Sequence, residues 1–212
     1  RDMSVLKHRL VTGSLVLAGV VGMVAVPSAS AVTSNGIVRA TIGSAITIDS
    51  VTPATLTLNI TPVSGGAQST DTVAVAVSTN SGNGYDLSVN TNAATNTMVF
   101  GANSIAASGN ITWGSAAALA NNTWGFAIPS GTSGLIAASG FDASYTATTN
   151  LTTNASKFMA MPTNASPLLV RSVTSGPVSA SSTPFWYSAK ADTTKPNGNY
   201  DATVVYTAVA RP

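Results

Sequence analysis

Apolar residues recur at every second position through much of the chain after residue 44. In the stretch that follows Gly84, Tyr85, Leu87 and Val89 alternate with an aspartate and a serine. Successive side chains of a β-strand point to opposite faces, so this spacing is typical of strands with one buried face. The same spacing recurs at Ile46/Ile48, Leu56/Leu58/Ile60, Val73/Val75/Val77, Trp124/Phe126/Ile128, Phe185/Tyr187/Ala189 and Tyr200/Ala202/Val204/Tyr206.

Turn-forming clusters separate these stretches, including SGGAQSTD, NSGNG, PSGTSG and KPNG. Valine and threonine are abundant, and their β-branched side chains favour extended backbone. Many short strands with turns between them predict an all-β fold, an antiparallel β-sandwich of the Ig-like or jelly-roll-like type. We expect one such domain at 45–212, preceded by an extended segment at 32–44. Where the alternation fades, at Asn90 to Asn122 and at Ala165 to Thr183, we expect surface connections.

The N-terminal residues have a different character. A basic stretch, Lys7 to Arg9, precedes an apolar run from Leu10 to Val26, and small residues follow at Ala29 and Ala31. This order predicts a helical secretory signal peptide at 3–31 with cleavage after Ala31, and therefore a secreted or extracellular location. A retained membrane anchor is the alternative, but the run is shorter than the about 20 apolar residues of a spanning helix. After cleavage we expect no membrane contact.

The composition argues against catalysis. The single histidine, His8, lies inside the predicted signal peptide, and the chain has neither cysteine nor glutamate. A mature chain without these residues lacks the usual general bases, thiol nucleophiles and zinc ligands, so we expect no enzyme and no cofactor.

The residues after Ala31 hold six basic and six acidic side chains. This balance gives no basic surface for nucleic acid.

Two similar stretches suggest a metal site. NGYDLSV begins at Asn83 and NGNYDATV begins at Asn197, and each carries a Tyr-Asp pair after asparagine and glycine. If the two stretches meet in space, Asn83, Asp86 and Asp201 could supply oxygen ligands for calcium. The alternative is a hairpin turn used twice, because asparagine, aspartate and glycine are the residues that tight turns favour.

The aromatic residues suggest a second kind of site. Trp186 shares a predicted strand face with Lys190 and Asp192 rather than with an apolar set, so we expect an exposed ring. An exposed indole beside polar groups could bind a carbohydrate by stacking, whereas a core anchor is the usual role of tryptophan. For Lys190 and Asp192, a solvated ion pair is the simpler interpretation.

Longer landmarks resemble a known class of proteins. The stretches ITIDSVTPATLTLNITPVSGG, NTWGFAI and FWYSAKADTTKPNGNYDATVVYTA are similar to those of secreted β-sandwich cell-surface proteins of Gram-positive-type and candidate-phylum bacteria. The resemblance implies an exported, envelope-associated, non-catalytic protein. In wall-associated pilins of Gram-positive type, a Lys-to-Asn isopeptide bond beside an acidic residue can staple such domains, which is a second interpretation for Lys190 and Asp192.

These observations lead to an expected function. We expect a bacterial cell-surface structural or adhesive protein that associates with itself or with other envelope proteins, through an edge strand around Ile37 to Ala45. A module that binds carbohydrate or a wall polymer is the alternative. It would take a glycan at Trp186, Lys190 and Asp192.

Overall fold

The computed structural model describes residues 39–109, 116–129, 132–135 and 157–212. The chain divides into two compact units, Arg1–Thr41 and Ile42–Pro212, and all described strands belong to the second. The expected signal peptide, with Ala29 and Ala31, lies outside the described residues and stays a prediction.

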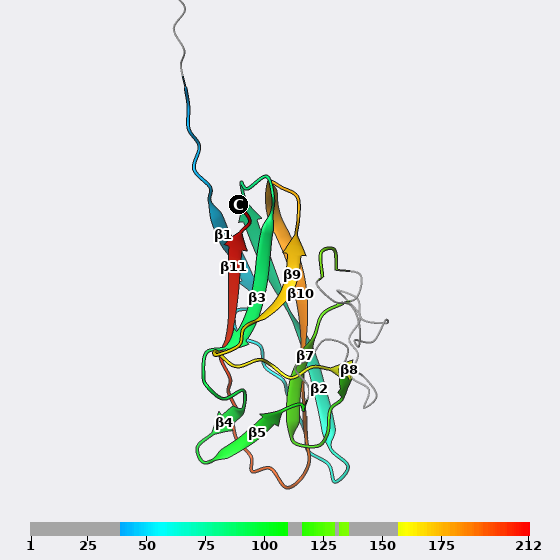
Figure 1. The fold of residues 1–212 in the computed structure, drawn as a ribbon. Helices are drawn as coiled ribbons and strands as arrows, with labels where there is room; N and C mark the ends of the chain where they lie inside the picture. Colours follow the sequence, from blue (N-terminus) through cyan, green and yellow to red (C-terminus); the bar gives the residue numbers. More distant parts are fainter. Residues whose placement is uncertain (1–38, 110–115, 130–131, 136–156) are drawn as a thin grey trace, which may run out of the picture. The chain divides into compact units, whose positions relative to one another are not determined.

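Every regular element of the described residues is a β-strand (Figure 1). The strands are β1 (Ile46–Thr52), β2 (Ala67–Thr79), β3 (Tyr85–Thr91), β4 (Met98–Phe100), β5 (Asn103–Ala107), β6 (Ala117–Ala118), β7 (Thr123–Ala127), β8 (Lys157–Phe158), β9 (Leu168–Val173), β10 (Val178–Ala191) and β11 (Val204–Ala210). The prediction of an all-β fold is confirmed for this part of the chain. Within these described residues, no helix has the length and apolar character needed to span a membrane.

The strands form three sheets. A six-stranded sheet has the order β1-β2-β10-β7-β5-β4, a three-stranded sheet has the order β11-β3-β9, and β6 pairs with β8. Most pairs are antiparallel, but β5 runs parallel to β7, with Ala106 opposite Thr123. The expectation of a wholly antiparallel arrangement is therefore wrong at this pair, where β5 reaches β7 through a long connection rather than a hairpin.

One buried cluster joins the two larger sheets. The alternating residues of β2 and β3 are buried, as the two-residue period predicts. From β10, Phe185 packs 5.1 Å from the ring of Tyr206 on β11 and 6.4 Å from Phe126 on β7, measured between ring centroids. The aromatic side chains therefore link strands of both sheets in the same apolar interior.

Three segments differ from the sequence expectation. Leu56, Leu58 and Ile60 alternate and pack against the core, but their segment is not a strand. It follows Pro53, which has no N–H to continue the ladder between β1 and β2. The two regions expected as surface connections also contain strands: β4, β5 and β6 lie within Asn90 to Asn122, and β9 and the start of β10 lie within Ala165 to Thr183.

β9 has no two-residue period, because the consecutive residues Val170 and Arg171 are both buried and the pairing with β3 shifts register beside them. Arg171 is buried although arginine counts as polar in a sequence pattern. Its Nη1 donates to Thr183 Oγ1 at 2.8 Å, to the Ser182 carbonyl at 3.0 Å and to the Tyr85 hydroxyl at 3.0 Å. Arg171 thereby connects β9 and β3 of one sheet with β10 of the other.

Candidate functional site

The predicted calcium ligands do not come together. Asp86 lies at the start of β3 and pairs in register with Val209, near the end of β11. Asp201 precedes the beginning of β11 and bridges Val99 of β4. The length of β11 therefore separates the two carboxylates, about 20 Å at the usual rise of about 3.3 Å per residue.

The side chains of Asp86 and Asn83 have other partners. Arg211 Nη1 donates to Asp86 at 2.9 Å, and Ser172 Oγ donates to the same carboxylate oxygen at 2.6 Å. Asn83 Nδ2 donates to the carbonyl of Pro212. The three predicted calcium ligands, Asn83, Asp86 and Asp201, are therefore not brought together, and that prediction is wrong. Asn83 and Asp86 instead connect the chain after β11 to the turn before β3, whereas Asp201 pairs with Val99.

The two Tyr-Asp stretches also differ from each other. Gly84 adopts a φ of +76° in the turn before β3, and Tyr85 is fully buried at the strand start. In the second stretch Gly198 is not among the glycines with positive φ, and Tyr200 lies before β11 rather than within it. Only the first stretch is the tight turn that opens a strand.

Trp186 is buried, with 2% of its surface exposed, so the expectation of an exposed ring is wrong. It sits in β10, between Thr72 of β2 on one side and Ala127 of β7 on the other. A strand inside a sheet can be covered on both faces, and a polar neighbour such as Ser188 is buried beside it. A stacking platform at Trp186 is therefore not available at the surface.

Asp192 is held by a set of hydrogen bonds just after β10. Thr194 donates from its hydroxyl at 2.5 Å and from its backbone N–H at 3.0 Å, and Asn122 Nδ2 donates at 3.1 Å. These bonds, those of Thr194 foremost, lower the pKa of Asp192 to about 2. Asp192 forms no ion pair with Lys190, so that interpretation is wrong.

Lys190 lies instead beside an asparagine. A Cβ built on Gly66 would lie 2.7 Å from Lys190 Cε and 2.2 Å from Asn121 Oδ1, so both side chains pack over this glycine. Asn121 Nδ2 also donates to Asp192 at 3.2 Å. The isopeptide bond remains only the alternative interpretation, and the low pKa of Asp192 makes this carboxylate a poor proton donor to a departing ammonia.

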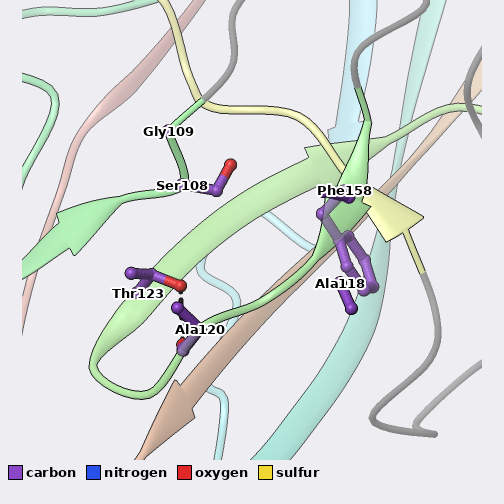
Figure 2. Close-up of a pocket in the computed structure, with 7 residues that line it drawn as sticks. Ser108, Gly109, Ala118, Ala120, Thr123 and Phe158 are labelled. Carbon is purple, nitrogen blue, oxygen red and sulfur yellow. Dashed lines mark hydrogen bonds between the residues drawn. The ribbon is translucent and has the colours of Figure 1, made fainter.

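A small cavity lies near β6 and β8 (Figure 2). Its volume is about 70 Å³, and Ser108, Ala117, Ala118 and Phe158 are among the residues that line it. The Ser108 hydroxyl is buried there without a hydrogen-bond partner. Small-molecule sites usually measure about 300–1,000 Å³, so this cavity does not fit a sugar ring or a cofactor.

The ends of the sheets offer a different kind of site. A strand at the end of a sheet exposes unpaired N–H and C=O groups, which can accept a strand from another chain unless the edge is protected. The outer edge of β4 is occupied, because Val99 and Asp201 exchange backbone hydrogen bonds of 2.9 and 3.0 Å. At β9, Ser172 N–H donates to the carbonyl of Gly134 at 2.7 Å.

In the two larger sheets, the two remaining end strands, β1 and β11, differ in their protection. β1 has a register shift between Ile48 and Ser50, carries Asp49 and is followed by Pro53, and all three features discourage strand addition. β11 reads VVYTAVA, without charge, proline or glycine, and pairs with β3 without a register shift. Among the described residues, no backbone group hydrogen-bonds to its second edge, although β1 of the six-stranded sheet is a close neighbour of β11.

The free edge of β11 is thus the best candidate site, and sequence reasoning missed it by choosing Ile37 to Ala45. The detectable signal was the uncharged, β-branched run at Val204 to Ala210.

The described residues contain no group of three or more histidine, cysteine or acidic side chains arranged to hold a metal. The chain matches no protein-family model, and no curated protein or solved structure is found to match it.

Proposed function

We propose that this chain is an exported, non-catalytic structural or adhesive protein of a bacterial cell surface, which associates with further copies of itself. The signal peptide at 3–31 delivers it, and residues 45–212 form a β-sandwich of the Ig-like or jelly-roll-like type. The observation that carries the proposal is the uncharged and unpaired edge of β11. Natural monomers usually protect such an edge with charge, proline or a bulge.

Charge and fold support the proposal. The residues after Ala31 balance six basic against six acidic side chains, so little net repulsion keeps two copies apart. For the sandwich, the support is that inward side chains of the six-stranded and three-stranded sheets belong to one buried cluster. The carbohydrate-binding alternative loses its platform, because Trp186 is buried.

Two measurements test the proposal. The full chain, expressed in a bacterial host, should appear outside the cell with Val32 as its first residue, and a cytoplasmic, unprocessed product would count against export. The purified 32–212 chain should then show a concentration-dependent increase in mass by sedimentation velocity. A monomer at every concentration up to the millimolar range would refute self-association.

A further inference from the structure

We infer that two copies of this chain pair β11 with β11 in antiparallel orientation, about a two-fold axis that passes beside Thr207. This inference rests on the proposed function and specifies its interface. The result is a continuous sheet in which the three-stranded sheets of two copies join edge to edge.

The backbone groups on the free edge follow from the pairing with β3. Arg211 N–H donates to the Gly84 carbonyl at 3.0 Å, and Asn92 N–H donates to the Thr203 carbonyl at 3.0 Å. Hydrogen-bonded positions alternate along an antiparallel pair, so Val205, Thr207 and Val209 also direct their polar groups toward β3. The intervening positions direct theirs to the free edge; these are Val204, Tyr206, Ala208 and Ala210.

One register pairs all four of these residues between two copies. With Thr207 opposite Thr207 of the second copy, Tyr206 faces Ala208 and Val204 faces Ala210, in both directions. Each such pair can exchange two N–H···O=C bonds. If the register shifted by one residue, the free N–H and C=O groups of one copy would lie opposite residues of the other copy whose backbone groups are already bonded to β3. If it shifted by two residues, one of the four residues with free backbone groups would have no partner in either copy.

The side chains are compatible with this register. On the outer face, Val205 meets Val209 of the second copy, and Val209 is 57% exposed in the single chain. The two Thr207 side chains face each other at the axis, which is a favourable cross-strand pair. The Arg211 guanidinium points to Asp86 on β3, so its charge is neutralised within its own chain. No like charges therefore meet across the strands.

The interface is small, because it consists of one strand from each copy. Specific complexes of ordinary stability bury about 1,200–2,000 Å² in total, which a single strand pair does not reach. We therefore expect a reversible dimer that forms at high protein concentration. On a cell surface, where copies are concentrated, this pairing would connect neighbouring molecules.

Charge at the axis provides the first test. Thr207→Lys places two ammonium groups opposite each other, so the dimer seen for the 32–212 chain by sedimentation velocity should be lost. Val99→Lys is the matched control, because Val99 is 50% exposed on the occupied edge of β4, and its dimer should persist. Tryptophan emission of both variants should match the parent, which shows that the fold is intact.

Cysteine crosslinking tests the register, since the chain has no cysteine of its own. At the axis, two Thr207 Cα atoms in a non-hydrogen-bonded pair lie about 4.5 Å apart, within the range of a disulfide. Thr207→Cys should form a crosslinked dimer under mild oxidation, while Val209→Cys alone should not. A mixture of Val205→Cys and Val209→Cys chains should crosslink to each other.

The outcomes separate this inference from the proposed function. A parent chain that never dimerises refutes both the inference and self-association. A dimer that persists in Thr207→Lys, or crosslinks through Val209→Cys alone, overturns the β11 register but leaves self-association standing. Loss of the dimer in Val99→Lys as well would place the interface elsewhere and would also overturn the inference.

Discussion

Replacing Tyr206 with phenylalanine should alter both the stability of the protein and its dependence on pH. The hydroxyl of Tyr206 on β11 lies 2.7 Å from that of Tyr187 on β10, and the bond connects the two larger sheets. Burial raises the pKa of Tyr206 to about 12. The pKa of Tyr187 is also raised, by burial first and by its neighbour Tyr206 second.

The sign and size of the effect follow from linkage between folding and proton binding. In the unfolded chain Tyr206 has its ordinary pKa of about 10 and loses its proton above that pH. The folded chain keeps the proton until about pH 12, so stability is full below pH 10 and falls as pH rises. Two pKa units correspond to about 3 kcal/mol lost from this group by pH 12.

At neutral pH the variant has a different defect. Tyr206→Phe leaves the buried Tyr187 hydroxyl without this partner, which should cost about 1–3 kcal/mol of unfolding free energy. As pH rises from 10 to 12, the parent loses the contribution of Tyr206 and the variant does not. The difference in stability should therefore shrink and vanish or reverse near pH 12.

Urea unfolding followed by tryptophan fluorescence at pH steps from 7 to 12 measures this difference. Tyr187→Phe/Tyr206→Phe provides the matched comparison, since it lacks both raised groups and should show a flatter alkaline profile than either chain. If the stabilities of the parent and Tyr206→Phe decline in parallel between pH 8 and 12, the reasoning from burial is wrong.

Three further predictions concern the turns and the polar cluster after β10. Gly84→Ala should destabilise the fold by at least about 1–2 kcal/mol, because φ is +76° and the new Cβ would lie 2.1 Å from the Val173 carbonyl oxygen. Gly82→Ala, with nothing within 4 Å, should leave the melting temperature nearly unchanged. Asp192 should titrate near pH 2 when its carboxyl carbon is followed by NMR, and Asn122→Ala should raise that midpoint because one hydrogen bond to the carboxylate is lost. The stability that the ionised Asp192 contributes to the fold is present above its ordinary pKa and is lost as the pH falls toward 2. The intact mass of the purified chain should equal that of its sequence, and a deficit of one ammonia would show that an isopeptide bond forms.

The sequence alone determined the strands that carry the core. The two-residue period of Tyr85, Leu87 and Val89 predicted their burial correctly, because side-chain direction along a strand is a local property of the backbone. The period failed at β9, where the consecutive residues Val170 and Arg171 are both buried at a register shift. It also failed at Leu56 to Ile60, where an apolar face packs on the core without a partner strand. A segment can bury its apolar side chains without pairing with a neighbouring strand, and the two-residue period of the sequence indicates only the burial.

Only the tertiary structure decided which strands are neighbours, and every error about sites followed from that. Trp186 is buried because β10 is covered on both faces from Phe185 to Ala189, whereas its polar sequence neighbours suggested an exposed face. Asp86 and Asp201 share a motif but lie toward opposite ends of β11, since β11 runs antiparallel to β3. The free edge of β11 is likewise a consequence of strand order, because an edge exists only where no neighbour follows, and contacts between residues distant in the chain determine that order.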